Sequence, residues 1–581
     1  MENKDEIGVV VPFAQDAEFF YRCACRYIEE DNLLLAVQYA RKAYRMEPHD
    51  VEYAITLAEI LNQMHRYEES VQVLLLVRPF GELPADALFG LASDFMGLEE
   101  FGAAGQCAEL CLEREPDGPY AERAADLLDL LDDREDLEIQ IGLDEGEDVK
   151  LLEQIRVAKA MRFSGNDAES VSFLEGLTER YPASDILDME IAMALFAMRE
   201  YERAEQRVFN IFKRNSHHIR ANLLMALLYH AEGRDAEANE QLARTVIDPD
   251  ASPEELGYAG AVFIEFDAID RAIDALERLR EFLPYDKDML HELAYCYLKN
   301  GDRQRAEETY QTLLTSDESD TVAAYYEEAI RKQPEKEFLK TWSLHYDVPL
   351  NAFLERQRRL QEVAQGGADA VRSVYAKDEQ FRDLLRWALF SQLSSFRKAV
   401  IRMLALVGGD EVELLLRRFL ITYDQGDEDK QFAFGSLLAL EAKPPFALYM
   451  GGTWQYGAVQ PMTVPEKLPR SFSYILWNIQ QVQHKAETAS KEDAQLVSDR
   501  VAEVGARIFL FYSASLQKRY PRLTPAQEDA MSAAFVLLAL SSLDQTDVTP
   551  EKLCSWYGVS KRRLENALQR IFRQLQKDKE Q

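Results

Sequence analysis

The sequence predicts an all-α protein, a superhelical solenoid of stacked helical pairs followed by a C-terminal helical domain. Three observations predict it. A register of 34 residues recurs along the first half of the chain, and small residues recur at fixed positions within that register. At 581 residues the chain is also too long for one compact core, which favours several domains or an elongated array.

The register defines eight units in two gap-free blocks. The units begin at Ala17, Val51 and Ala85 in the first block, and at Leu151, Asp185, Ile219, Pro253 and Lys287 in the second. A period of this length is typical of a helix–turn–helix unit, which buries its apolar face by stacking on its neighbours.

Two positions of the unit carry only Ala, Gly or Ser. Two antiparallel helices can interlock closely only where small side chains lie at their crossing. Position 8 holds Ala24, Ala58, Ala92, Ala158, Ala192, Ala226, Gly260 and Ala294. Position 20 holds Ala36, Ser70, Ala104, Ser170, Ala204, Ala238, Ala272 and Ala306.

Other positions mark the bulk and the ends of the helices. Position 11 is large: Tyr27, Leu61, Phe95, Met161, Leu195, Tyr229, Phe263 and Tyr297. Proline at position 32 stops the second helix in four units, and glycine at position 15 marks the internal turn in three. With this pattern, residues 17–320 closely resemble the tetratricopeptide repeat family. The resemblance implies a solenoid with a concave surface that binds other proteins.

The register breaks once, between the third and fourth units. Residues 119–131 keep the pattern of an amphipathic helix, but residues 129–148 contain ten carboxylates and one arginine. We interpret 119–150 as a degenerate repeat whose second helix has become a solvated acidic loop. An acidic docking segment is the alternative. In either case we expect the array to bend here.

The expected organisation follows from these boundaries. We assign, in order, an N-terminal segment 1–16, repeats 1–3 at 17–118, the degenerate repeat at 119–150, repeats 4–8 at 151–320, a capping helix and linker at 321–345, a helical region at 346–450, a Gly/Pro-rich loop or hairpin at 451–470, and a C-terminal helical domain at 471–581.

The region 346–450 contains a second, weaker repetition. The stretches AVIRMLAL at 399–406 and AFGSLLAL at 433–440 lie 34 residues apart, and each precedes a further apolar stretch, VELLLRRFL or PPFALYM. This resembles two HEAT-type helical hairpins. In the Gly/Pro-rich segment that follows, Trp454 and Tyr456 are expected to pack back on the helices, with a contact point as the alternative.

The resemblance to the tetratricopeptide family also implies which side chains line a peptide-binding groove. In the family, positions 2, 5, 9, 12 and 13 of the first helix point into it. Carried over, the groove residues are Tyr21, Phe89, Met96, Ile155, Lys159, Arg162, Met189, Met193, Phe196, Leu223, Leu227, His230, Ile264, His291 and Tyr295. Chaperone-binding members clamp a carboxylate with Lys and Asn at set positions that are mostly apolar here, so that activity is not supported.

The groove composition predicts the kind of partner. An apolar floor with acidic rims suits a basic or amphipathic peptide or helix of another protein. The alternative is a groove that is filled from within, by the superhelix itself or by intramolecular docking of the C-terminal domain.

The last segment resembles a helix-turn-helix of bacterial regulators, and also the end of a cyclin-type repeat. A short helix from Pro550 is followed by a turn at 558–560 and a helix over 561–576. One face of that helix carries side-chain types that read base edges in a DNA major groove, namely Arg562, Asn566, Gln569 and Arg573. A plain helical bundle is the favoured interpretation, because any surface helix shows a polar face.

The charge is uneven along the chain. The net charge is −36, with 12 basic and 35 acidic residues in 1–150, 23 and 39 in 151–350, and 31 and 28 in 351–581. The acidic array disfavours nucleic acid and anionic membrane as partners. The six cysteines form no disulfide framework, and no signal peptide or membrane span is evident, so a cytoplasmic location is expected.

No motif for catalysis or for a cofactor is present in the sequence. There is no phosphate-binding glycine loop, and the cysteines and eight histidines do not show zinc-ligand spacing. We therefore expect no enzyme activity, no cofactor and no metal. The leading hypothesis is a protein-binding scaffold or adaptor; the alternative is a transcriptional regulator whose repeats sense a peptide and whose tail reads DNA.

Overall fold

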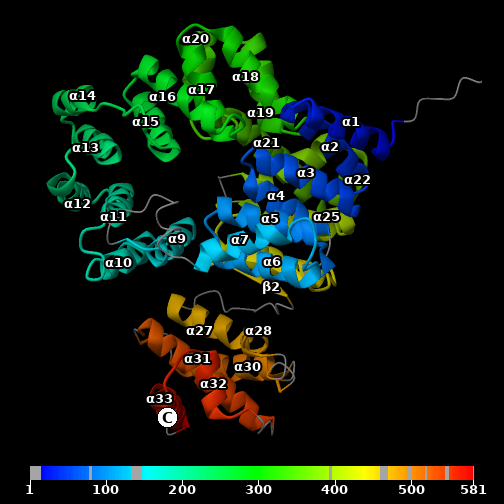
Figure 1. The fold of residues 1–581 in the computed structure, drawn as a ribbon, viewed down its shortest axis with the longest axis vertical. Helices are drawn as coiled ribbons and strands as arrows, with labels where there is room; N and C mark the ends of the chain where they lie inside the picture. Colours follow the sequence, from blue (N-terminus) through cyan, green and yellow to red (C-terminus); the bar gives the residue numbers. More distant parts are fainter. Residues whose placement is uncertain are drawn as a thin grey trace, which may run out of the picture. The chain divides into compact units, whose positions relative to one another are not determined.

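The computed structural model describes residues 15–77, 82–132, 147–391, 396–457, 469–490, 493, 496–497, 500–516, 520–521, 523–543 and 548–579. Two compact units are formed. The first contains Met1–Leu440 and Ala447–Trp454, and the second contains Glu441–Phe446 and Gln455–Gln581. Figure 1 shows that both are built almost entirely of helices.

The first unit begins with the repeats. Repeats 1–3 are the pairs α1 (Ala17–Glu29) and α2 (Leu33–Met46), α3 (Val51–Gln63) and α4 (Tyr67–Val77), and α5 (Ala85–Gly97) and α6 (Phe101–Arg114), followed by α7 (Ala121–Asp132). Repeats 4–8 are α9 (Val149–Phe163) and α10 (Asp167–Leu177), α11 (Asp185–Ala197) and α12 (Tyr201–Arg214), α13 (Ile219–Ala231) and α14 (Asp235–Arg244), α15 (Pro253–Glu265) and α16 (Ile269–Phe282), and α17 (Lys287–Lys299) and α18 (Arg303–Ser316).

The all-α repeat fold predicted from the register is confirmed. Seven of the eight first helices begin at the residue that the register predicts, and the other, α9, begins two residues earlier, at Val149. Most of the acidic segment between the blocks, residues 133–146, lies outside the described residues.

All sixteen small residues at positions 8 and 20 are buried at the crossing of the paired helices. Gly260 shows how tight the crossing can be. A Cβ atom at this position would lie 2.5 Å from Cδ2 of Leu276, which is closer than any real contact. An alanine at this position would therefore force the side chain of Leu276 to shift.

The turn inside each repeat has one conformation. The residue at position 15 has a positive φ in all eight units, although only three of these residues are glycine. The others are Asp31, His65, Glu99, Arg199 and Asp267. A left-handed conformation costs a non-glycine residue roughly 1–2 kcal/mol, so packing of the two helices imposes the turn.

The first repeat also contacts the last one. Helix α2 packs against α18, and Arg45 Nη2 lies 2.7 Å from Asp317 Oδ1. Lys42 Nζ lies 3.2 Å from Glu318. Arg66 of repeat 2 adds a hydrogen bond to Ser316 Oγ over 3.1 Å. The two ends of the array are thus joined within the first unit.

Helices without the 34-residue register follow. They are α19 (Thr321–Lys332), α20 (Glu335–Phe338), the 3₁₀ turn η2 (Leu339–Thr341), α21 (Leu350–Gln365), α22 (Gly367–Lys377), α23 (Glu379–Phe390), α24 (Arg397–Val407), α25 (Asp410–Leu420) and α26 (Asp427–Ala439). Helix α19 is the capping helix expected from the sequence. Helix α25 packs against α4, where Arg418 Nε donates to Gln72 Oε1 over 2.7 Å.

The expectation of a second complete helical hairpin after 433 was wrong. The stretch PPFALYM, expected as its second helix, instead supplies strand β1 (Phe446–Met450), which pairs with β2 (Thr453–Gly457). Pro444 and Pro445 precede the strand and Gly451 and Gly452 follow it, so too few residues remain between these breakers for a helix.

The hairpin turn reaches both blocks of repeats. The ring of Trp454 packs edge-on against Phe95 of α5, with 5.2 Å between centroids. A Cβ atom on Gly452, whose φ is +76°, would lie 2.9 Å from Cα of Val157 in α9. Arg156 of α9 also donates to the carbonyl oxygen of Glu99. These contacts join repeats 3 and 4 where the register breaks.

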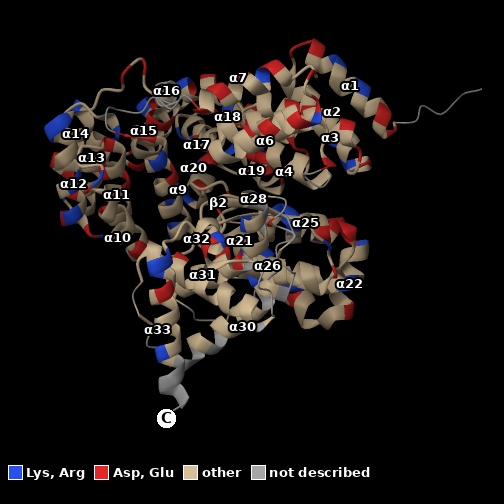
Figure 2. Cartoon of the chain, turned by 60° about the horizontal axis from the view of Figure 1, so that its bottom comes forward, with Lys and Arg blue, Asp and Glu red and all other residues tan. Residues whose placement is uncertain are grey.

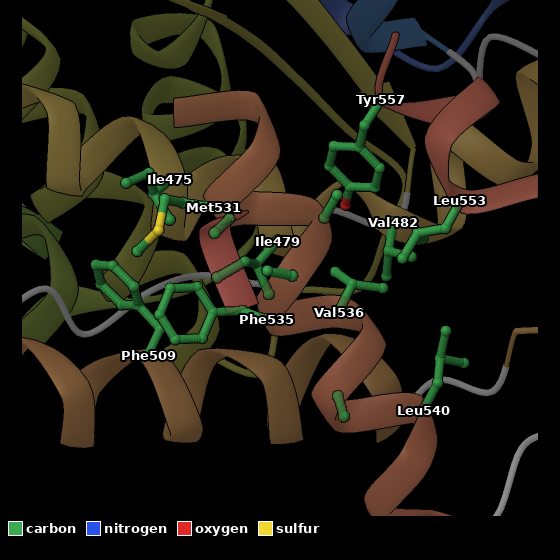
Figure 3. Close-up of a cluster of buried hydrophobic side chains, with 14 of the residues drawn as sticks. Ile475, Ile479, Val482, Phe509, Met531, Phe535, Val536, Leu540, Leu553 and Tyr557 are labelled. Atoms are coloured by element: carbon green, nitrogen blue, oxygen red, sulfur yellow. The ribbon is translucent and has the colours of Figure 1, made fainter. Parts of the chain in front are cut away.

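The second unit is a helical bundle. Its helices are α27 (Arg470–Gln480), α28 (Val482–Ala489), α30 (Arg500–Ser515), α31 (Pro525–Ser542), α32 (Pro550–Trp556) and α33 (Lys561–Lys579). Thr524 and Gln527 form the capping box that the sequence predicts at the start of α31. Figure 3 shows the core, in which Phe509 meets Phe535 at 5.3 Å and Ile479, Val482 and Val536 fill the centre.

Candidate functional site

The first helices of repeats 4–8 form one continuous surface of the first unit. Each of these helices, α9, α11, α13, α15 and α17, contacts the next, and Figure 1 shows them following one another within the first unit. We call their accessible side chains the A-helix face. Charged side chains cross it from helix to helix. Lys159 lies 3.4 Å from Glu190, Arg220 lies 3.6 Å from the same carboxylate, and Arg220 lies 2.9 Å from Glu254. This ladder places α9, α11, α13 and α15 side by side.

Apolar side chains accompany the ladder. Arg220 Nη2 lies 3.2 Å from the sulfur of Met193, one turn before Phe196 on α11. Met193, Phe196, Leu227 and Tyr295 are all partly exposed. Five sequence-predicted groove residues are therefore accessible on this face, these four and Lys159.

Five other predicted groove residues are buried. Ile155, Met189, Leu223, Ile264 and His291 are each at most 6% exposed. Four of them stand at position 5 of their repeats, on the side of each first helix that packs against other helices. Their apolar character serves the packing of the array, and they offer no accessible surface in this structure.

His291 is buried because a later segment covers it. Its Nε2 lies 2.7 Å from the carbonyl oxygen of Ser343, and its Nδ1 lies 2.6 Å from the hydroxyl of Tyr310. A carbonyl only accepts, so Nε2 carries the proton and Nδ1 accepts from Tyr310. Burial lowers the pKa of His291 to about 4, which keeps it in this neutral form.

The covering segment closes the repeat-8 end of the A-helix face. Trp342 and Tyr346 lie with ring centroids 5.3 and 5.4 Å from His291, and Trp342 also lies 5.7 Å from Tyr295. The chain thus covers this part of the A-helix face with its own residues.

Predicted residues of the first block lie elsewhere. Tyr21 donates to Glu52 Oε1 over 2.7 Å, and Phe89 stacks on Tyr120 at 5.1 Å. Met96 is partly buried at the end of α5. These three side chains belong to α1 and α5 and do not join the A-helix face of repeats 4–8.

Two predicted residues lie at the ends of first helices. Arg162 lies 3.6 Å from Asp167, and the exposed His230 lies 2.8 Å from Asp235. Both side chains are held by the turn or second helix of their own repeat.

The face is acidic toward repeat 8. Burial, reinforced by the charges of Asp288 and Asp286, raises the pKa of Glu292 to about 8. The cation Lys299 is paired with Asp267 at 2.5 Å. A cationic group placed beside Glu292 would therefore stabilise its ionised form.

Sequence reasoning did not identify Glu190 and Arg220 as site residues, although they are central to the ladder. They stand at positions 6 and 2 of their repeats. Opposite charges at these positions in adjacent repeats were the available signal. The apolar residues at positions 5, 9 and 12 form the more prominent pattern.

Among the described residues, no cluster of three or more His, Cys, Asp or Glu side chains is placed to hold a metal ion. No helix in the described part of the chain is long and apolar enough to span a membrane.

The helical pair α17–α18 settles the nature of the repeats. Residues 288–320 match the family described as "Tetratricopeptide repeat". The pair α17–α18 is thus a tetratricopeptide repeat, and the other seven pairs share its 34-residue register. Proteins built from such repeats generally mediate protein–protein interactions.

A curated relative shares part of this chain. The TPR repeat-containing protein YvcD of Bacillus subtilis (strain 168) is 30% identical over 242 residues, which cover 40% of this chain and 49% of that protein. The chain thus spans about half the length of this relative.

Solved structures match this chain at low identity and low TM-score. YrrB, described as a TPR protein with an unusual peptide-binding site, is 15% identical with a TM-score of 0.23, covering 29% of this chain and 88% of that chain. The P58(IPK) TPR domain is 14% identical with a TM-score of 0.23, covering 54% and 97%. The human IFIT1 dimer with m7Gppp-AAAA is 12% identical with a TM-score of 0.28, covering 66% and 95%.

Proposed function

We propose that this protein is a non-catalytic scaffold or adaptor that binds a segment of a partner protein on the A-helix face of repeats 4–8. The observation that carries the proposal is the combination on one face of partly exposed apolar side chains and a cross-helix ladder of charges. Phe196 and Leu227 offer apolar contact area, while Glu190 and Glu254 hold charge beside it.

The chemistry of the face favours a basic, amphipathic segment. Apolar side chains of such a segment would contact Met193, Phe196 and Leu227. Its Lys or Arg side chains would pair with Glu254, whose side chain is 64% exposed, or with Glu292. Apolar contacts would supply affinity, and pairs of opposite charge would fix the orientation of the bound segment.

Binding should depend on pH because Glu292 is protonated below its pKa of about 8. A cationic partner favours the carboxylate, so complex formation releases a proton and becomes tighter as pH rises from about 6 to 8. The Glu292→Gln variant should bind with a flatter pH dependence over this range, measured by titration calorimetry with the captured partner. An unchanged slope would exclude Glu292 from the contact.

The location is tested by removing the apolar contacts. The triple variant Phe196→Ala, Leu227→Ala and Tyr295→Ala should lose a stoichiometric partner in affinity capture from native cells, with helical content retained in circular dichroism. Removing a few central interface side chains commonly costs about 2 kcal/mol or more each.

A matched control uses exposed apolar residues away from the A-helix face. Phe209 of α12 and Phe282 of α16 lie on second helices and are 45% and 49% exposed, and Val246 is 78% exposed. Their triple replacement by Ala should leave capture intact. Capture that survives the first triple variant, or fails equally in both, would refute this location.

A further inference from the structure

The second unit ends in two helices held at a fixed turn. Helix α32 and helix α33 are joined by residues 557–560, where Gly558 has a φ of +60° and Val559 is 8% exposed. The hydroxyl of Tyr557 donates to the carbonyl oxygen of Asn478 over 2.8 Å, which ties the turn to α27. The start of α33 is therefore positioned by the core of the bundle.

One side of α33 is buried against the bundle. Leu564, Ala567 and Ile571 are at most 6% exposed, and α33 packs on α31 and α30. At about 3.6 residues per turn the opposite side must face outward. That side carries Arg562, Asn566, Gln569 and Arg573, at spacings of four, three and four, and all four are exposed. We call these four residues the α33 polar face.

The α33 polar face has no partner within the described part of the chain. None of its four side chains forms a hydrogen bond or ion pair with a described residue. Other charges near the turn are paired: Lys561 lies 2.8 Å from Glu551, and Lys552 lies 2.5 Å from Asp493. Among the described residues, the guanidiniums of Arg562 and Arg573 thus form no ion pair.

The α33 polar face lies in a segment of positive net charge. Arg563 is exposed on one flank, and Glu565 with the half-exposed Phe572 lies on the other. Residues 551–581 contain eight basic and four acidic residues, in contrast to the acidic repeats. Figure 2 shows basic residues along α33.

We propose that the α33 polar face binds duplex DNA in the major groove. Arginine pairs with the O6 and N7 atoms of guanine, and asparagine or glutamine pairs with N6 and N7 of adenine. An α-helix about 10–12 Å across fits a groove about 12 Å wide. A helix face that docks another protein presents apolar anchors. Among the described side chains of α33, Phe572 is the only exposed large apolar one. The proposal is independent of partner binding on the A-helix face.

The proposed DNA binding is tested by removing the two arginine charges of the α33 polar face and comparing the result with a matched control. The full-length protein is titrated against a fluorescent 24-base-pair duplex of mixed sequence, followed by anisotropy at 50 and 200 mM salt. The wild type should bind at 50 mM and weaken as salt rises. Arg562→Ala with Arg573→Ala should weaken binding at least tenfold and flatten the salt dependence. Both residues are exposed, so thermal unfolding should be unchanged.

The control removes the same charge elsewhere. Arg22→Ala with Arg26→Ala neutralises two exposed arginines of α1 and should leave DNA affinity within twofold. No wild-type binding at 50 mM salt, equal losses in the two variants, or tighter binding to single-stranded RNA of the same length would each overturn the proposal. Capture of the protein partner is unaffected by any of these results.

Base reading is tested separately from backbone binding. Selection of duplexes from a random library should yield a preferred sequence for the wild type. In the double variant Asn566→Ala with Gln569→Ala, the ratio of affinities for the preferred and the mixed-sequence duplex should fall on the order of tenfold. The affinity for the mixed-sequence duplex should stay unchanged. A preference that persists in this variant would overturn the assignment of the two amides.

Discussion

At the scale of single residues, the hydrogen bonds around the buried Asp94 of repeat 3 indicate that its carboxyl group is protonated. The hydroxyl of Ser70 lies 3.0 Å from the carbonyl oxygen of Ala58 and 2.5 Å from Asp94 Oδ2, but it has only one proton to donate. If Asp94 is protonated, it donates to Ser70, and Ser70 donates to Ala58. Burial raises the pKa of Asp94 to about 8, which supplies this proton at neutral pH.

This arrangement predicts the effect of pH on stability. The pKa of Asp94 lies near 8 in the folded chain and about 3.9 in the unfolded chain. The folded state therefore binds the extra proton between these values, and stability falls as pH rises through about 8. Asp94→Asn keeps a donor for Ser70 and an acceptor for Asn62 without ionising. Its midpoint of urea unfolding should fall less between pH 6.5 and 9.5 than that of the wild type; parallel curves would contradict this.

At the scale of elements, the crossing of the two helices in each repeat depends on a small residue at position 8. Seven repeats use alanine there, and repeat 7 uses glycine. Leu276 of α16 fills the space that a Cβ atom on Gly260 would need. The size of the Leu276 side chain on α16 thus limits the size of the residue at position 260 on α15.

Gly260→Ala should therefore destabilise the protein. The clash with Leu276 is expected to cost about 1–3 kcal/mol, which exceeds the gain of about 1 kcal/mol that alanine brings to a helix. Gly435→Ala is the control, because a Cβ atom at this position in α26 meets nothing within 4 Å. Thermal unfolding should show a lower midpoint for the first variant and an equal or higher one for the second. The opposite order would disprove the tight crossing.

At the scale of the first unit, Asp317 joins the two ends of the array. Burial alone would raise its pKa, but Arg41, Lys287 and Arg45 hold the pKa well below its usual range. The stabilisation is therefore present above about pH 4 and is lost as pH falls through the lower folded pKa. The two ends of the array are held together because Asp317 of repeat 8 attracts the cations Arg41 and Arg45 of repeat 1.

Asp317→Asn should open that contact. With the charge removed, Arg45 keeps only its longer contact with Glu318, at 3.5 Å, and the buried Arg41, which pairs with Glu69, loses the attraction of a second carboxylate. The positive charge at the interface is then less well compensated. Amide hydrogen exchange in α2 and α18 should accelerate on the order of tenfold, equivalent to about 1.4 kcal/mol. Glu18→Gln removes an exposed pairing with Arg22 and should leave that exchange unchanged. Equal exchange in wild type and Asp317→Asn would contradict the closure.

Local patterns predicted the helices because each repeat obeys short-range rules. A small residue at position 8 packs near position 20 of the same unit. The proximity of Ala24 and Ala36 can therefore be predicted from the sequence of one repeat alone. The left-handed turns escaped prediction at Arg199 and His65 because helix packing, not residue type, imposes them. The strand at 446–450 escaped it because a short apolar run fits a helix as well as a strand.

The groove was predicted less completely for a related reason. Position 5 was assigned to the groove by resemblance, but whether its side chain is exposed depends on neighbouring elements. Met189 and Leu223 are buried by packing in the array, and His291 is buried by the segment that contains Trp342.

The sequence by itself determined the repeat unit, its register and the polar face of the last helix, because these follow from periodicities within one or two helices. Only the tertiary structure decided which first-helix residues stay accessible, how α2 meets α18, and how the turn of the hairpin bridges α5 and α9. Those contacts join residues that are distant in the chain. Their partners are selected by shape and charge in three dimensions, which no local spacing records.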